Sequence, residues 1–230
     1  MPLYKQEIPK SSRMGYLKIL SYIQDILLVE VGSIGHSDYA RKWIQETIPY
    51  PALLYTIPLT QKQLIMGDLS LVTKGLEDLI QQYHPKIIFV IESAIITTIG
   101  LNLQPVCSQL ENQYGIMIVN RTLTMQNDEK IGQSWALYDL CQYLLVQPMI
   151  KTETFNIIGN DTISELFIST LEKKYHLKLN IQLPSNINIG SLEKLTQAKL
   201  NIVVSEEGLK VAKYLKRKYQ MEYIEAVDIG

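Results

Sequence analysis

The sequence predicts an α/β protein of two domains with mainly parallel sheets. Short apolar, β-branched runs alternate with segments of helical periodicity along most of the 230 residues. The run at residues 87–91, which follows Lys86, is continuous and apolar, which is typical of a parallel strand buried on both faces. A segment from Gln147 to Thr152, which looks like a linker, separates two such series. We therefore expect domains at residues 1–150 and 151–230.

In the first half of the chain, apolar runs typical of strands alternate with segments of helical periodicity. Pro51 and Pro58 bound one apolar run, and Pro85 precedes the central run, which ends at Glu92. The expected strands are residues 26–29, 52–56, 86–92 and 116–119. The expected helices are residues 14–22, 38–48, 68–83, 103–114 and 132–145.

The second half repeats this rhythm without repeating the sequence. The expected strands are residues 155–158, 178–183, 201–204 and 223–227. The expected helices are residues 164–175, 191–197 and 208–219. Alternation of this kind favours parallel sheets with right-handed crossovers.

Composition argues against several classes of protein. The formal net charge of −1 gives no electrostatic case for nucleic-acid binding. A basic cluster does occur on the last expected helix, where we interpret it as a solvated face; it comprises Lys213, Lys216, Arg217 and Lys218. No run has the length and purity of a membrane span, and residues 1–13 lack the apolar core of a signal peptide. These features predict a soluble, cytoplasmic protein without nucleic-acid or membrane partners.

The chain has two cysteines, Cys107 and Cys141, far apart in the sequence. Two cysteines form no disulfide framework and cannot fill a four-thiolate metal site within one chain. Both fall on expected helix faces among apolar residues, where a free cysteine acts as a small hydrophobe.

Several segments resemble one known family. Tyr83-His84-Pro85-Lys86 resembles its Y-x-P-K entry into a buried strand, and Gly32-Ser33-Ile34-Gly35 resembles its HGPxGC loop. Ile99-Gly100 resembles its IGDD turn. The similar segments of the second half are residues 155–159, 191–195, 198–205 and 212–215. The family is nitrogenase component 1, which includes the molybdenum-iron protein subunits, their cofactor-assembly scaffolds and the dark-operative protochlorophyllide reductases.

The resemblance implies two Rossmann-like domains, corresponding to the first two of the family's three. It also implies work in a reductive, metallocofactor or tetrapyrrole pathway, as a homodimer or as a heterodimer with a nitrogenase-like subunit. An ATP-dependent reductase is a further implied partner. Family subunits hold iron–sulfur clusters at the pair interface, through cysteines of their first domains.

The cluster cysteines of the family are missing here. Their positions correspond to His36, to Ala94 and to Ser11 or Ser12, and the IGDD aspartates correspond to Leu101 and Asn102. We therefore expect no iron–sulfur cluster on the isolated chain, and the cofactor stays open.

Polar residues follow the expected strands of the first half. Because parallel strands end at one edge of a sheet, we expect these residues to line that edge and to form a ligand site. The candidates are Glu30, Ser33, His36, Glu92, Ser93, Asn120 and Arg121. Glu92 either contacts a ligand or metal, or caps the next helix or pairs with Arg121, because a carboxylate leaving a buried strand needs a partner or a raised pKa.

His36 is the one candidate metal ligand, because imidazole can replace thiolate for several metals. The alternative is a helix cap or surface position. Gly159-Asn160-Asp161-Thr162 precedes a helix and could offer N–H groups to an anion, or simply cap that helix.

Two functions remain open at this stage. The first is a subunit of a nitrogenase-like assembly without its own cluster ligands. The second is a small-molecule or metal-binding module that uses a cleft between the domains. For the first, we expect an exposed apolar patch for a partner, supplied by Met14, Leu17, Leu20, Ile23, Met66 and Leu69.

Overall fold

The computed structural model describes residues 11–32, 34–49, 51–123, 128–144, 150–159 and 162–226. It contains two four-stranded sheets in which every neighbouring pair is parallel, as the sequence predicts. The first sheet has the order β2-β1-β3-β4, from β1 (Leu27–Gly32), β2 (Leu53–Pro58), β3 (Ile87–Glu92) and β4 (Met117–Arg121). The second has the corresponding order β6-β5-β7-β8, from β5 (Thr152–Ile158), β6 (Lys178–Leu183), β7 (Ala198–Val203) and β8 (Glu222–Glu225).

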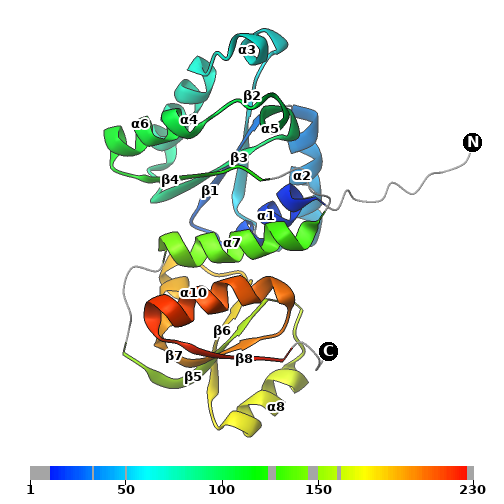
Figure 1. Cartoon of the computed structure of the whole chain (residues 1–230), viewed down its shortest axis with the longest axis vertical. Helices are drawn as coiled ribbons and strands as arrows, with labels where there is room; N and C mark the ends of the chain where they lie inside the picture. The colour runs from blue at the N-terminus through cyan, green and yellow to red at the C-terminus, as the bar shows by residue number, and fades with distance from the viewer. Residues whose placement is uncertain are drawn as a thin grey trace, which may run out of the picture.

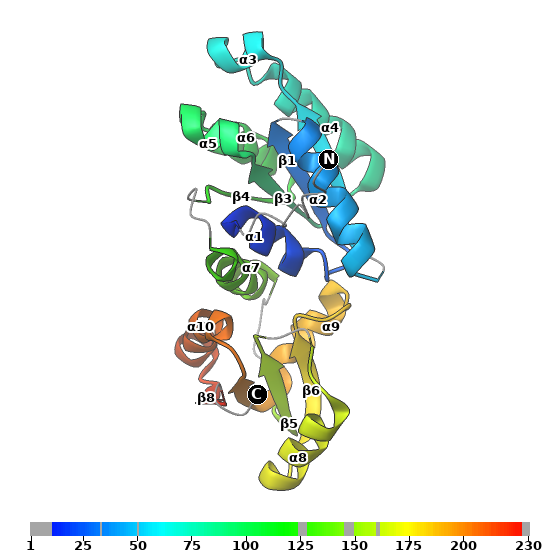
Figure 2. The same ribbon diagram turned by 90° about the vertical axis from the view of Figure 1, so that its right-hand side faces the viewer.

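Helices cover both faces of the first sheet (Figures 1 and 2). The face toward the second sheet packs against α1 (Ser12–Leu20), α2 (Ile34–Thr47) and α7 (Glu129–Leu144). The other face packs against α4 (Ser70–Tyr83) and α6 (Gln104–Tyr114). Two short helices, α3 (Gln61–Met66) and α5 (Ala94–Ile99), follow β2 and β3.

The second sheet is also covered on both faces. One face packs against α8 (Glu165–Tyr175). The other packs against α9 (Ile189–Glu193), the 3₁₀ turn Lys194–Gln197 and α10 (Leu209–Tyr219), which follows the 3₁₀ turn Glu206–Gly208. In Figure 1, α7 crosses the middle of the molecule with the first sheet above it and α10 below it.

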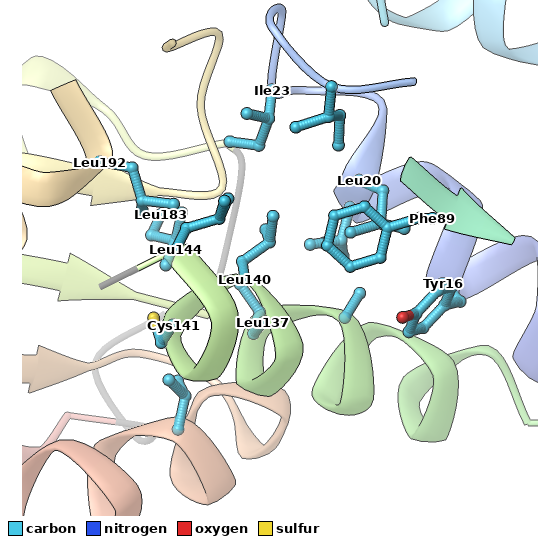
Figure 3. Packing of buried hydrophobic residues seen from close by; sticks show 14 of the residues in the cluster. Tyr16, Leu20, Ile23, Phe89, Leu137, Leu140, Cys141, Leu144, Leu183 and Leu192 are labelled. Carbon is cyan, nitrogen blue, oxygen red and sulfur yellow. The ribbon is translucent and has the colours of Figure 1, made fainter. Parts of the chain in front are cut away.

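One apolar core joins the two sheets through α7. Its side chains include Phe89 from the first sheet, Leu140 and Leu144 from α7, and Leu183 and Leu192 from the second half, all buried (Figure 3). This core therefore crosses the expected boundary near residue 150, and each half also has an apolar cluster of its own. The boundary stays a prediction, and residues 147–149 of the expected linker lie outside the described residues.

Helices α1 and α7 approach each other backbone to backbone. A Cβ added to Gly132 would lie 1.7 Å from the carbonyl oxygen of Ser12, and one added to Gly15 would lie 2.0 Å from that of Glu129. Real Cβ atoms show no contacts this short. The two glycines therefore set the distance between the helices.

Several expectations need correction. The first four members of the predicted exposed patch are buried in the shared core, with Met14 at 3% exposure and Leu17, Leu20 and Ile23 at 0%. The cause is the close packing of α7 along α1. Helix α2 begins at Ile34, four residues before its predicted start, and the short helices α3 and α5 were not expected.

Candidate functional site

The carboxyl ends of β1 and β3 lie side by side at the centre of the first sheet. The order β2-β1-β3-β4 makes this pair the point where the connections reverse direction, and such points are where open α/β sheets bind ligands. Glu30 lies within β1, Glu92 is the last residue of β3, and Asn120 and Arg121 end β4. The predicted residues therefore do share one edge, although they lie in the strands and not after them.

The pleat divides these residues between the two faces of the sheet. Glu30 pairs in register with Ile91, and Arg121 pairs with the same residue from the other side. Glu92 pairs with Val31, one position further. Because successive side chains point to opposite faces, Glu30 and Arg121 face α1 and α7, whereas Glu92 and Asn120 face α4 and α6.

The expected Glu92–Arg121 pair is therefore wrong. Arg121 instead binds Asp139 of α7 through two contacts, Nε to Oδ2 at 2.5 Å and Nη2 to Oδ1 at 2.6 Å. The hydroxyl of Tyr16 on α1 donates to the same carboxylate at 2.7 Å. Burial, and then the neighbouring Asp139 carboxylate, raise the pKa of Tyr16 well above its usual value. This network ties α1, α7 and β4 together.

Glu30 also forms an ion pair, with Arg13 of α1. Its Oε1 accepts a hydrogen bond from the guanidinium of Arg13 at 2.5 Å, and its side chain is fully buried. The other oxygen, Oε2, is buried without a hydrogen-bond partner among the described residues. Glu30 is thus half of an internal ion pair between β1 and α1.

Glu92 has the chemistry of a candidate proton donor or acceptor. The residue is 5% exposed, and burial raises the pKa of its carboxyl group, against hydrogen bonds from the side chains of Asn120 and Thr122 that lower it. A buried carboxylate with a raised pKa, next to neutral hydrogen-bond donors, holds a proton more readily than an exposed one and can exchange it with a ligand. It is the strongest single candidate at this edge.

The crevice between the carboxyl ends of β1 and β3 is filled by a side chain. Gly32, at the end of β1, has φ +144°, and an added Cβ would lie 1.7 Å from Oγ of Ser93. In the second sheet, Gly159 has φ +121°, and an added Cβ would lie 2.4 Å from Oγ of Ser205. In each sheet a serine after the third strand therefore fills the crevice beside a glycine that ends the first. Asn160 and Asp161, of the candidate anion loop, lie outside the described residues.

The metal candidate His36 stays a prediction. Ser33 and the side chain of His36 lie outside the described residues; the backbone of His36 belongs to the first turn of α2 and not to a loop. Among the residues that the structure describes, no group of three His, Cys, Asp or Glu side chains is placed to hold a metal ion. The other residues predicted to bind a ligand at this edge offer carboxylate, amide and hydroxyl oxygens and the Arg121 guanidinium.

Neither cysteine offers a reactive thiol to this edge. Cys107 on α6 and Cys141 on α7 are free and fully buried. Burial raises the pKa of Cys107 to about 12, with nearby Glu111 and Glu92 adding to the effect, and raises that of Cys141 further above its usual range. Neither thiol is a ready metal ligand.

An apolar groove beside this edge was not predicted as a site. We call it the α3–α5 groove; it has a volume of about 610 Å³ and is lined by Gln61, Leu64, Ile65, Met66, Gly67, Ile95, Ile99, Gly100 and Leu101. Four of its apolar side chains are exposed: Ile65 (84%), Met66 (72%), Ile95 (40%) and Ile99 (48%). Of the predicted patch, Met66 belongs to this groove. An apolar surface of this kind marks an interaction site.

No helix among the described residues is long and apolar enough to cross a membrane. The pattern that defines the nitrogenase component 1 type oxidoreductases matches residues 11–230. The chain is 24% identical over 230 residues to the nitrogenase iron-molybdenum cofactor biosynthesis protein NifE of Clostridium pasteurianum, covering 94% of this chain and 49% of that protein.

A shorter match, 30% identical over 115 residues, is to a subunit of the light-independent protochlorophyllide reductase of Picosynechococcus, covering 48% of this chain and 22% of that protein. Among solved structures, nitrogenase Cp1 at pH 5 superimposes with a TM-score of 0.76 and 15% identity, covering 98% of this chain and 49% of that one. The same protein at pH 6.5 gives the same score. The chain thus spans about half the length of the nitrogenase-type proteins that it matches over most of its own length.

Proposed function

Because this chain belongs to the nitrogenase component 1 type oxidoreductase family, we propose that it acts as a subunit of a nitrogenase-like assembly in a metallocofactor or tetrapyrrole pathway. In this proposal it pairs with a second component 1-like chain and carries no four-iron cluster by itself. The similarity to a cofactor biosynthesis protein and to a protochlorophyllide reductase supports the choice of pathways.

The observation that carries the proposal is the chemistry of the two thiols. Iron–sulfur clusters are held chiefly by cysteine thiolates, and Cys107 and Cys141 are buried in helices with their pKa values raised. The positions where the family has cluster cysteines include Ala94, which begins α5. Redox chemistry in such an assembly would therefore use ligands from the partner chain.

The α3–α5 groove is the proposed pairing surface. The resemblance places a family cluster position at Ala94, and the family's clusters lie where two first domains meet. Ile95 and Ile99 follow Ala94 on the same helix and are exposed in the groove. An apolar surface next to that position is what a subunit interface requires, since the core of such an interface is apolar.

Two finer points belong to the same proposal. An ATP-dependent reductase would deliver electrons to the assembly, as the resemblance implies. The location would be the cytoplasm, because two free cysteines without a disulfide are typical of a reducing compartment.

The cluster part is tested by anaerobic purification of the chain alone, followed by iron and sulfide analysis and visible spectroscopy. We expect no stoichiometric iron. A cluster that survives substitution of both Cys107 and Cys141 by serine would contradict the proposal, because other residues would then ligate it.

The pairing part is tested by light scattering over a wide concentration range, alone and after co-expression with a cysteine-bearing component 1-like chain from the same genome. We expect a dimer, and we expect Ile65→Lys with Ile99→Lys to weaken it by at least about tenfold, because two charges would be buried. The control is Leu166→Lys, an exposed apolar residue on α8 (77%) outside the groove. Equal effects of both changes, or a monomer under all conditions, would refute the pairing.

A further inference from the structure

A second groove lies between α7 and α10, which pack against each other between the two sheets. We call it the α7–α10 groove; it has a volume of about 300 Å³ and is lined by Trp135, Tyr138, Lys210, Lys213, Tyr214 and Arg217. It contains three cations, three aromatic side chains and no carboxylate. Its volume is at the lower end of the range for small-molecule sites.

The cations of this groove form no ion pair with an acidic side chain that the structure describes. Lys210, Lys213 and Arg217 are spaced by three and four residues, so they share one face of α10 and repel each other. Among the described residues, no carboxylate oxygen lies within ion-pair distance of any of them. Burial, and then the Arg121 guanidinium, lower the pKa of Lys210. A local excess of positive charge therefore remains to be compensated.

The other basic residues of α10 differ in this respect. Lys216 binds Glu222 at 2.7 Å, and Lys218 lies over the rings of Tyr214 and Tyr219 at 5.4 and 5.2 Å. The helix dipole accounts for cations in the last turn, but Lys210 and Lys213 lie before it. The sequence therefore combines two sets of cations on one helix, one paired and one facing the groove.

The aromatic side chains form a continuous wall from α7 to α10. The ring centroids of Trp135 and Tyr138 are 5.8 Å apart, and those of Tyr138 and Tyr214 are 5.1 Å apart, both edge to face. The ammonium of Lys210 lies 3.3 Å from the Trp135 centroid, and the guanidinium carbon of Arg121 lies 4.0 Å from it. These cation–π contacts fix the indole ring and hold a positive charge against the wall.

We propose that the α7–α10 groove binds a small organic phosphate, with its phosphate against Lys213 and Arg217 and its flat organic part against Tyr138 and Tyr214. Arginine offers paired donors that match phosphate oxygens, and lysine adds a compact charge. The aromatic wall adds apolar contact for a ring. This proposal is independent of the pairing surface proposed above.

An adjoining groove limits where the anion can lie. It shares Trp135 and Lys210 and also contains Glu206 and Glu207, whose carboxylates lie 3.4 and 4.0 Å from the ammonium of Lys130. These acids repel an anion from that side. The phosphate is therefore expected at the Lys213–Arg217 end.

The fluorescence of Trp135 can report binding in the α7–α10 groove. The chain has two tryptophans, so Trp43→Phe leaves Trp135 as the single reporter. Titration with AMP should change its fluorescence saturably, with a millimolar or lower Kd that weakens as NaCl rises from about 50 to about 500 mM. Adenosine and inorganic phosphate, which each supply one half of the ligand, should bind more weakly than AMP.

Variants separate this site from general charge effects. Lys213→Gln and Arg217→Gln should each raise the Kd for AMP roughly two- to fivefold, the range for an exposed ion pair, and the double variant roughly tenfold. Lys216→Gln is the matched control, because it removes the same charge from the same helix outside the groove, and it should leave the Kd within about twofold. Circular dichroism checks that each variant is folded.

Three results would overturn the proposal. The first is no saturable signal with AMP or phosphate at several millimolar. The second is equal weakening by Lys216→Gln and Lys213→Gln, which would show non-specific attraction. The third is binding of adenosine as tight as that of AMP, which would remove the role of the cations.

Discussion

Gly132→Ala tests the contact between α1 and α7 most directly. Two effects of opposite sign compete. Replacing a helical glycine by alanine favours the helix by about 1 kcal/mol. The new methyl group, however, would lie 1.7 Å from the carbonyl oxygen of Ser12 and 2.8 Å from the backbone nitrogen of Tyr16. Ordinary contacts begin near 3.4 Å, so the helices must separate by more than an ångström.

Separation of the helices should outweigh the gain in helix propensity. The obstacle is backbone, which cannot move away by changing a rotamer, and overpacking of a tight contact costs about 1–3 kcal/mol or more. The separation also loosens the apolar core around Leu20 and Leu137. We expect a net loss of about 2 kcal/mol in the free energy of unfolding, which corresponds to a drop of roughly 1 M in the urea midpoint.

The matched control is Gly35→Ala in α2, where an added Cβ meets nothing within 4 Å. This variant should be neutral or stabilised by up to about 1 kcal/mol. Gly15→Ala should resemble Gly132→Ala, and the double variant should lose less than the two single losses combined, because one separation accommodates both methyl groups. Urea unfolding followed by circular dichroism measures all four. A Gly132→Ala protein as stable as Gly35→Ala would refute the reasoning.

Three further predictions concern buried polar groups. Asp139→Asn should lower the free energy of unfolding by about 2–3 kcal/mol, because it leaves the partly buried Arg121 without its counter-ion, whereas Asp38→Asn in an exposed pair should change it by less than about 1 kcal/mol. Equal changes would contradict this. Glu92→Gln should raise the free energy of unfolding at neutral pH, because the raised pKa of Glu92 means that the folded state disfavours the carboxylate. This stabilisation should vanish as the pH falls below about 4.5, where the carboxyl group is protonated in both states. A stabilisation that grows in acid would contradict the raised pKa. Cys107 and Cys141 should react with a thiol reagent slowly in the native protein and rapidly in denaturant, and fast native labelling would contradict their burial.

Most strands and long helices could be predicted from the sequence because each has a strong period of its own. Helix α5 could not, because Ile95, Ile96 and Thr97 continue the β-branched character of β3. It forms because Ile96 packs into the core and Gly100 ends the helix with a left-handed φ of +68°. Tertiary packing therefore makes this segment helical, although its local propensity favours a strand.

The edge of the first sheet could be predicted, but the partners of its residues could not. Arg121 and Asp139 are 18 residues apart, on a strand and a helix whose relative rotation no periodicity gives. The separation of Glu92 from Arg121 follows from the register between β3 and β4, which the sequence alone does not determine. Glu30 was expected beyond the strand because a charge within a buried strand requires a partner, and Arg13 becomes visible only when α1 is in place.

Little in the sequence indicates that the aromatic and basic residues of the α7–α10 groove lie together. Lys213 and Arg217 belong to the basic cluster that the sequence indicates, and on a single helix such a cluster resembles any solvated face. Trp135 and Tyr138 lie on a different helix, more than seventy residues earlier. The groove exists only because the shared core brings these two helices together.

The position of α7 restricts how the molecule can move. Hinged opening between the sheets would bring Leu140, Leu144 and Leu192 into contact with water. Exposing each costs about 1.5–3 kcal/mol, so an opened form would account for fewer than about one molecule in a thousand. The two halves should therefore tumble as a single body and give one set of rotational correlation times in solution. Any ligand of this chain must then enter from the outer surface, and its arrival cannot depend on the halves swinging apart.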